Sequence, residues 1–566
     1  MKFNTLFRKK TTEKLLSDAY AEHNISGGLN KTLTVTDLTL FGIAAIIGGG
    51  VFSTIGRAAY DGGPAIAVLY LAFAITCIFS AYCYARFASS VPISGSAYTY
   101  AYNSLGEIVA WILGWNLVLE YAISNVTVAI SWSDYFTTLL EGLNFHIPGY
   151  LSNGYLTAKN GYDDSLALIA KGEALPESLK VMKTLWENAP VVGGIKFIID
   201  LPALLITIGI TSLVYRGIKE SKNINNVLVI LKLMAILLVV VAGAFFVKPE
   251  HWIPFAPNGL SGVMAGVAAV SFAYIGFDSI STTAEECKNP QRDIPKSMMN
   301  SLLICTILYI TTVLIMTGMV SYKELRVGDP LAYIFQKVNM NVIAGIVSVG
   351  AVIATTSALL AYQIGQPRIW MVMSRDGLLP KVFGRIHPKF KTPSFSTIIT
   401  GILVGIPALF LDQAYVTDLT AIGTLFAFSL VCGGVLMLDE RKVESKFKVP
   451  YVNGKYIVGF LLLSAILFLI FKSPQTLLTW KHEIVTGEKW ADVLLKLTFF
   501  LFWAWLSIMS FKKNLSLIPV AGVLINFFLM TELGSDNWLR FIVWCMIGFA
   551  IYFGYGYRKS KLAVVE

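Results

Sequence analysis

Charge is scarce in this chain of 566 residues: charged residues make up 14% of it, against 55% hydrophobic residues. The mean hydropathy is +0.65. A soluble protein of this length carries more charge than this. The composition therefore indicates a protein that crosses a membrane many times rather than a soluble enzyme.

Cysteine and histidine are also rare, with six and five residues respectively. The cysteines all lie in or near apolar stretches, none stands in a long outer loop, and none forms a CxxC pair. No histidine falls in a metal-ligand spacing such as HExxH. The sequence therefore predicts no disulfide framework, no metal site and no cofactor.

Long apolar stretches are abundant. Segments of about 20 apolar residues, the length that crosses a bilayer as a helix, recur roughly fourteen times. They begin near positions 41, 66, 108, 198, 224, 261, 300, 342, 395, 419, 456, 494, 515 and 538. Since the first 32 residues are polar, with Arg8, Lys9 and Lys10 but no apolar core after them, no cleavable signal peptide is expected. The predicted fold class is an all-α polytopic membrane protein with 12 to 14 spans.

Lysine and arginine are unevenly shared between the two sides. If the spans alternate, roughly twice as many of them fall on the side of the N-terminus, which predicts that both termini are cytoplasmic. The same rule explains the net charge of +10 without a nucleic acid partner. The stretch at about 141–197 is polar and punctuated by Gly and Pro, and it is predicted to be an outer loop with a short helix near 176–187. We interpret it as solvated and without a role in the chemistry.

Lys232 lies within an otherwise apolar run, VLVILKLMAILLVVVAGAFFV, over Val227–Val247. A lysine near the centre of a membrane helix costs about 2.5–3.5 kcal/mol, so it is rarely kept without a partner, a cavity or a task. The alternative is a long stem that reaches the membrane interface past Asn225 and Asn226. We favour a role in ion or proton coupling.

Two spans carry interruptions. The first reads GIAAIIGGGVF, with Gly48, Gly49 and Gly50 together, and the sixth reads SFAYIGFDSISTTAEE, with Gly276 before Asp278. Successive glycines lower helix stability by about 1 kcal/mol each relative to alanine, and unwound backbone at membrane depth is tolerated only beside a cavity. Close packing of small residues is the alternative. Because one interruption opens each of two groups of five spans, we interpret them as a transporter site.

Such a site suits a zwitterion, since half-helix N-termini bind a carboxylate and unwound carbonyls bind an ammonium group. Glu120 is predicted either to accept hydrogen bonds there or to be structural, and Asp278 to cap the unwound part of span 6. Phe272 and Tyr274 are candidate gates or cavity walls, although packing is their commoner role. On span 8, Thr355 is a candidate lining residue, unless its hydroxyl bonds its own helix.

At these residues the chain resembles the amino acid, polyamine and organocation transporter superfamily, and within it the bacterial members of the cationic amino acid transporter family. The resemblance covers most of residues 33–440. It rests on LTVTDLTLFGIAAIIGGGVFSTIG, GWNLVLEYAIS, SFAYIGFDSISTTAEECKNPQRDIPKSM, GQPRIWMVMSRDGLLPKVFGRIHPKFKTP and AIGTLFAF. It implies the leucine-transporter fold, a 5+5 inverted repeat, with about four additional helices after it. The long 141–197 loop and the glycine triplet depart from the family pattern.

The resemblance also implies residue roles. The substrate carboxylate is expected on the backbone of the segment around Ile47, Gly48, Gly49 and Gly50, and its amino group on carbonyls around Phe272, Ala273 and Ile275. Lys232 matches a lysine of proton-coupled relatives, and Thr355 matches a position that lines the side-chain pocket. The expected function is therefore import of L-amino acids by proton symport through alternating access.

Other functions stay open from the sequence: an obligate exchanger of amino acids or polyamines, or a nutrient sensor that does not translocate. The expected organisation is a cytoplasmic segment at 1–35, a transporter core at 36–440, further spans at 441–557 and a cytoplasmic tail at 558–566. The expected location is the bacterial plasma membrane. Whether a small membrane subunit joins the spans is left open.

Overall fold

The helices follow the apolar runs of the sequence. The computed structural model describes residues 6–10, 33–90, 96–172, 175–216, 222–390, 392–440, 447 and 449–562. Among these, eight helices are long and apolar enough to cross a membrane, or up to ten if each of two bent helix pairs is one span, and four apolar helices are shorter. Each predicted stretch lies in one of them, which confirms the all-α membrane class. Most of the predicted segment 1–35 and residues 441–446, 448 and 563–566 lie outside the described residues.

The first five spans contain one broken span and four continuous helices. Their elements are α2 (Val35–Ile46), the π-helix η2 (Gly50–Thr54), α3 (Ile55–Gly62), η3 (Gly63–Ala65), α4 (Ile66–Ser90), α5 (Ser96–Ser104), α6 (Glu107–Gly142), α9 (Leu201–Arg216) and α10 (Lys222–Ala244). The capping residue Thr34 begins α2, since its backbone N–H donates to Asp37 Oδ2 at 2.9 Å.

The next five spans repeat this order. Their elements are α11 (Gly259–Ala265), α12 (Val267–Tyr274), the 3₁₀ helix η6 (Phe277–Glu286), α13 (Pro290–Met319), η7 (Tyr322–Glu324), α14 (Pro330–Lys337), α15 (Asn341–Arg375), η8 (Lys381–Gly384), α16 (Ser394–Phe410) and α17 (Gln413–Glu440). Helices of equal rank pack against each other: α4 on α13, α6 on α15, α9 on α16, and the two broken spans on one another. The 5+5 architecture therefore brings both interruptions to the same place.

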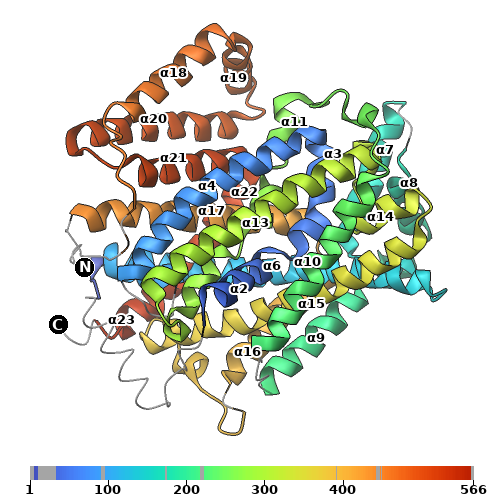
Figure 1. Cartoon of the computed structure of the whole chain (residues 1–566), viewed down its shortest axis with the longest axis horizontal. Helices are drawn as coiled ribbons and strands as arrows, with labels where there is room; N and C mark the ends of the chain where they lie inside the picture. The colour runs from blue at the N-terminus through green and yellow to red at the C-terminus, as the bar shows by residue number, and fades with distance from the viewer. Residues whose placement is uncertain are drawn as a thin grey trace.

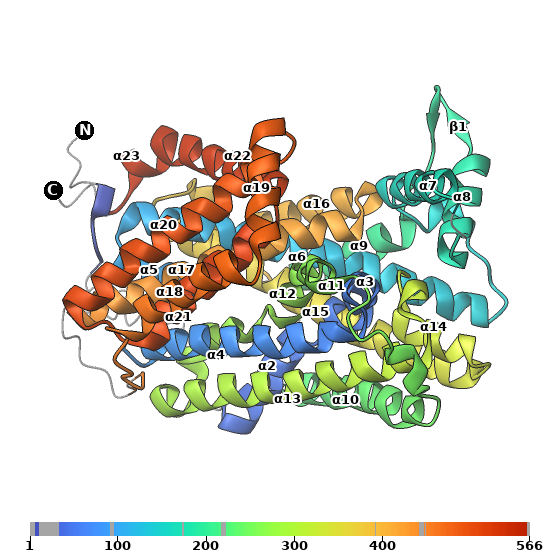
Figure 2. The same ribbon diagram turned by 90° about the horizontal axis from the view of Figure 1, so that it is seen from above.

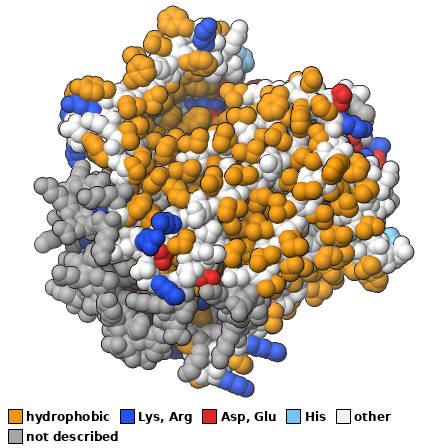
Figure 3. Space-filling model, in the orientation of Figure 1, with side chains coloured by type: hydrophobic (Ala, Val, Ile, Leu, Met, Phe, Trp, Pro, Cys, Tyr) orange, Lys and Arg blue, Asp and Glu red, His pale blue; other side chains and the backbone are white. Residues whose placement is uncertain are grey.

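The remaining spans lie beside this core. They are α18 (Ile457–Phe471), α19 (Pro474–Thr486), α20 (Trp490–Lys513), α21 (Leu517–Glu532) and α22 (Ser535–Ile551), followed by η9 (Tyr552–Gly556) and α23 (Tyr557–Lys559). Figure 1 shows α18, α19 and α20 on one flank of the bundle, and α23 at the opposite end from α7, α8 and α14. Hydrophobic side chains cover most of the face in Figure 3, and its middle shows almost no charge. This is the surface expected of a helix bundle in lipid.

The C-terminal part of the last long helix, α22, is bonded to the first turns of α6. The indole N–H of Trp111 donates to the Gly548 carbonyl at 2.9 Å, and Trp115 and Trp544 each donate to the other's carbonyl, at 2.9 and 3.3 Å. At the end of α6, the Glu107 carboxylate accepts from Tyr552, at 2.9 Å, and from Ser560, at 2.5 Å. The end of the chain is thereby held on the core.

The segment at 141–197 is folded. It contains η4 (Gly149–Leu151), α7 (Tyr155–Ala170), α8 (Glu177–Asn188) and a two-stranded antiparallel hairpin, β1 (Val191–Val192) with β2 (Ile195–Lys196). The predicted helix near 176–187 is confirmed as α8, whereas α7 and the hairpin were not predicted. An ion pair between Arg326 and Asp164, 2.7 Å long, joins α7 to the loop before α14.

Candidate functional site

The first interruption begins where α2 ends. Ile47 is extended, with φ −79° and ψ 97°, and the chain resumes as a π-helix at Gly50. The glycines allow close approach: a Cβ on Gly50 would lie 2.5 Å from the Cα of Ala273, and one on Gly48 would lie 3.2 Å from the Cβ of Ala358. At Gly50 only glycine fits without movement of the backbone.

The second interruption faces the first. Helix α12 ends at Tyr274, Ile275 is extended, and Gly276 has a φ of 108°, a conformation that residues with a Cβ rarely adopt. A Cβ on Gly276 would also lie 2.7 Å from the Ala45 carbonyl oxygen. Both broken spans therefore expose backbone polar groups at one level of the bundle, as expected from the sequence.

Lys232 reaches the first interruption. Its side chain is fully buried, and its Nζ donates to the carbonyl oxygens of Ala44 and Ile47, both at 3.1 Å. These carbonyls lie at the end of α2, where a helix leaves its last acceptors unpaired and where its dipole favours a cation. The alternative in which the lysine reaches the membrane interface is therefore wrong.

Tyr309 on α13 connects the two interruptions and was not predicted. Its hydroxyl lies 3.1 Å from the Ile46 carbonyl oxygen and 2.8 Å from that of Ala273. A tyrosine in an apolar helix usually only packs, so no pattern singled it out. Together, Lys232 and Tyr309 bind carbonyls at the end of α2, and Tyr309 also binds one on α12.

The two aromatic candidates of span 6 point in different directions. Phe272 lies next to the triplet, since its Cε1 would be 3.6 Å from a Cβ on Gly49. The Tyr274 hydroxyl instead lies 3.0 Å from the Tyr70 carbonyl oxygen and 3.1 Å from Thr306 Oγ1. Its ring stacks on Phe73 and it packs between α4 and α13. The structure thus places the Tyr274 side chain in helix packing, the commoner of the roles considered from the sequence.

Thr355 is fully buried on α15, the helix that also contacts α2. Its hydroxyl donates to the Ala351 carbonyl at 2.7 Å, so the polar group is satisfied within its own helix. The methyl group is the part of this residue that remains for packing or for a ligand. Its predicted place in a side-chain pocket stays a prediction.

Two carboxyl groups, those of Glu120 and Asp278, are buried near each other. Glu120 on α6 lies near the hydroxyl of Thr424 on α17 and within electrostatic range of Asp278. Asp278 lies in the first turn of η6, directly after the second interruption. The structure thus places two buried carboxyl groups close together beside the second interruption, whereas their individual roles stay predictions.

Two side-chain contacts connect the first broken span to α17. Ser53 donates to Gln413 Oε1 at 2.8 Å, and Arg57 on α3 forms an ion pair of 3.0 Å with Asp418. Both lie on the α3 side of the interruption, so they tie this part of the first span to α17. The hydrogen bond between Ser53 and Gln413 was not predicted from the sequence.

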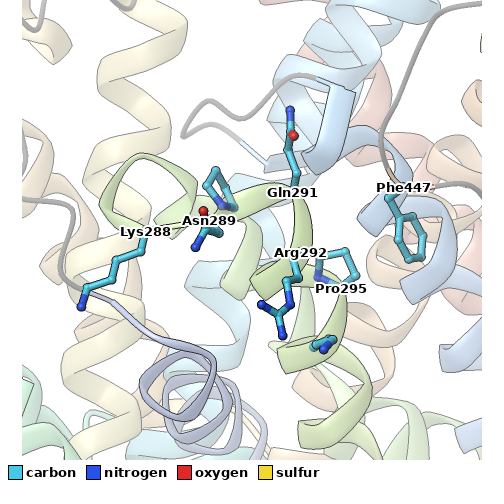
Figure 4. A pocket seen from close by; sticks show the side chains of 8 residues that line it. Lys288, Asn289, Gln291, Arg292, Pro295 and Phe447 are labelled. Atoms are coloured by element: carbon cyan, nitrogen blue, oxygen red, sulfur yellow. The ribbon is translucent and has the colours of Figure 1, made fainter.

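At the other end of the bundle there is a basic hollow of about 660 Å³ where α13 begins (Figure 4). It is lined by Lys288, Asn289, Pro290, Gln291, Arg292, Pro295, Lys296 and Phe447. It lies at the end where α2 begins, because the Lys288 N–H donates to the Leu33 carbonyl at 3.2 Å. None of these residues belongs to the interruptions. Over the described part of the chain, no group of three or more His, Cys, Asp or Glu residues is placed to hold a metal ion.

Comparison with known proteins agrees with this geometry. Residues 33–482 match the family model described as amino acid permease, and residues 515–560 match the model of its C-terminus. The methylthioribose transporter of Bacillus subtilis is 40% identical, over 79% of this chain and 89% of its own. The branched-chain amino acid permease BcaP of the same organism is 35% identical over 99% of both chains.

A vacuolar cationic amino acid transporter of Arabidopsis thaliana is 29% identical, over 99% of this chain and 96% of its own. The chain is thus less similar to this cationic amino acid transporter than to the two Bacillus subtilis transporters. Two facing interrupted spans in a 5+5 bundle, matched by a family model over most of the chain, lead to one conclusion: the chain belongs to the amino acid permease family, whose members are transporters and not enzymes.

Proposed function

We propose that the protein imports small, mostly apolar L-amino acids by proton symport. The observation that carries this proposal is the contact of a fully buried lysine with the carbonyl oxygens of Ala44 and Ile47 at an interruption. A lysine without solvent can give up its proton, whereas an arginine cannot. Protonation and deprotonation of Lys232 would therefore change the bonds that hold the end of α2.

The substrate would lie between the interruptions. Its carboxylate would bind backbone N–H groups of Gly48, Gly49 and Gly50, and its ammonium group the carbonyls of Phe272, Ala273 and Ile275. Val128 and Phe272 lie within 3.7 Å of the position of a Cβ on Gly49. These apolar neighbours support an apolar substrate side chain, in agreement with the relative named as a branched-chain amino acid permease.

Alternating access supplies the physical mechanism. The Arg57–Asp418 and Ser53–Gln413 contacts would break as the α3 end opens and form again as it closes. Glu120 and Asp278 would line the part of the substrate path that leads toward the other end of the bundle. In this proposal the protein lies in the bacterial plasma membrane with both termini cytoplasmic, and residues 36–440 form the transporter core.

Uptake by purified protein in proteoliposomes tests the function. With labelled amino acids, including valine, leucine, alanine and arginine, we expect accumulation of the apolar ones only when the outside is more acidic than the inside. Methylthioribose belongs in the panel because a relative is named for it. Uptake that needs an internal amino acid and ignores the pH difference would favour an exchanger, and saturable binding without uptake would favour a sensor.

A change at Thr355 tests substrate selection. If its methyl group faces the side-chain pocket, Thr355→Met should exclude leucine and valine but spare alanine and glycine, because filling a packed pocket by a methylene or two alters discrimination by about 1–3 kcal/mol. Thr355→Val, which keeps the volume and loses only the hydroxyl, is the matched control and should keep the native ratio. Competition against labelled alanine gives the ratio, and equal losses for small and large amino acids would assign Thr355 a structural role.

A further inference from the structure

The hairpin β1–β2 is apolar and exposed. The exposed fractions of Val191, Val192 and Ile195 are 63%, 65% and 67%. Between the strands, Gly193 and Gly194 have φ values of 60° and 83°, which glycine allows for a tight turn. Three large aliphatic side chains on so short a hairpin would leave an apolar tip in water, and such a patch usually has a partner.

The hairpin is held close to the place where the chain enters the bundle. Its base closes through the N–H of Phe197, which donates to the Pro190 carbonyl at 2.7 Å, and the Asp200 N–H donates to the Leu409 carbonyl at the end of α16, at 3.0 Å. Only a few residues separate Lys196 from Leu201, where α9 begins, so they can span roughly 15 Å at most. The hairpin must therefore lie near the level at which α9 begins and α16 ends.

From there the hairpin points sideways. Figure 2 shows it standing out from the bundle, across the direction in which α4 and α13 run. The nearby lengths of α9 and α16 expose Leu205, Ile208, Ile406 and Phe410, which belong to the surface that faces lipid. The exposed apolar residues of the hairpin thus lie close in the chain to helices that expose apolar side chains of their own.

The residues beside the tip fit a membrane–water boundary. Lys196 donates to the Trp186 carbonyl and also lies over the Trp186 ring, 5.4 Å from its centroid. Tryptophan and lysine are enriched at that boundary because each has an apolar part and a polar end. A second copy of the protein is a poorer partner for this hairpin than lipid, because each strand has only two residues and offers few backbone groups for pairing.

We propose that the β1–β2 hairpin inserts Val191, Val192 and Ile195 into the lipid boundary beside α9 and α16, so that the segment 141–197 is docked on the membrane rather than fully solvated. Docking requires no transport step. It gives this segment an attachment to lipid, in addition to its contacts with the bundle such as the Arg326–Asp164 ion pair.

Spin-label accessibility in vesicles of phosphatidylethanolamine and phosphatidylglycerol tests this proposal. Ile195→Cys carries the label, and Lys180→Cys, on exposed α8 in the same segment, is the matched control. Most native cysteines are buried and Cys545 is partly so, so the parent protein treated with the same label supplies the background. At an exposed position the cysteine leaves the fold intact.

Oxygen concentrates in lipid, whereas a water-soluble nickel chelate does not enter it. We expect the label at position 195 to relax more with oxygen than with the chelate, and the label at position 180 to show the reverse order. Equal, water-like behaviour at both positions would overturn the proposal. It would also be overturned if signal broadening at position 195 disappears when labelled protein is diluted with unlabelled protein, because a second copy would then be the occupant.

Discussion

With Lys232→Ala, accumulation of substrate driven by an inward proton gradient is expected to disappear. The substitution removes the side chain that would exchange a proton, and it leaves the carbonyls of Ala44 and Ile47 without their donor. Counterflow and binding should survive in part, since most substrate contacts are expected from the broken spans. Uptake with and without a pH difference, measured beside binding on the same preparation, separates coupling from recognition.

Lys232→Arg is the matched variant for charge. A guanidinium group stays protonated at any working pH, so it can bond the same carbonyls but cannot release a proton. We expect it to fail in gradient-driven uptake as the alanine variant does, while preserving the fold better. Accumulation at the native level by the alanine variant would contradict the proton role and favour exchange.

The second large effect is expected at Gly49. Gly49→Val should abolish binding of every amino acid alike, because its two γ-methyl groups extend beyond a Cβ that would already contact Val128 and Phe272, and they would fill the space in front of the glycine N–H groups. Gly49→Ala is the matched control: its Cβ would lie at ordinary contact distances, 3.5 Å from Val128 and 3.6 Å from Phe272. Alanine favours the helical backbone over glycine by about 1 kcal/mol, which must be overcome when the segment unwinds. We therefore expect the Gly49→Ala variant to bind substrate only about five-fold more weakly than the native protein.

Binding to detergent-purified protein, followed by thermal shift or scintillation proximity, checks this pair. Size-exclusion profiles must be the same for both variants, so that misfolding is not read as loss of the site. Near-native binding by correctly folded Gly49→Val would place the substrate elsewhere. Loss with the valine variant and retention with the alanine variant would locate the carboxylate at the first interruption.

The order of the spans was predictable because each span corresponds to a continuous apolar stretch of the sequence. The interruptions were predictable for a similar reason, since glycine at Gly48–Gly50 and at Gly276 weakens the helix wherever the rest of the chain lies. Helices α7, α14 and α19 were missed because none of them is itself an apolar run of membrane-spanning length. The hairpin was missed because Gly193–Gly194 sits between strands of only two residues.

The partners of individual side chains were less predictable than the positions of the helices and of their interruptions. The cost of a buried charge singled out Lys232, but its partners lie nearly 190 residues away in sequence and depend on how α10 is rotated against α2. Tyr274 and Tyr309 show the same limit. Both are tyrosines in apolar helices, yet only Tyr309 bonds carbonyls at both interruptions, and Tyr274 packs against α4. Helix rotation distinguishes them, and no local pattern encodes it.

The bonds between α6 and α22 bear on how the protein moves. Because Trp111, Trp115 and Glu107 lie in the first turns of α6 and bond to Gly548, Trp544 and Tyr552, the C-terminal part of α22 is tied to the N-terminal part of α6. Any rocking of α6 during a transport cycle must carry α22 along or shear several hydrogen bonds at once. We therefore expect that the boundary between moving and static parts does not coincide with residue 440, and that the end of the last long helix travels with the start of the third span, although some 400 residues separate them.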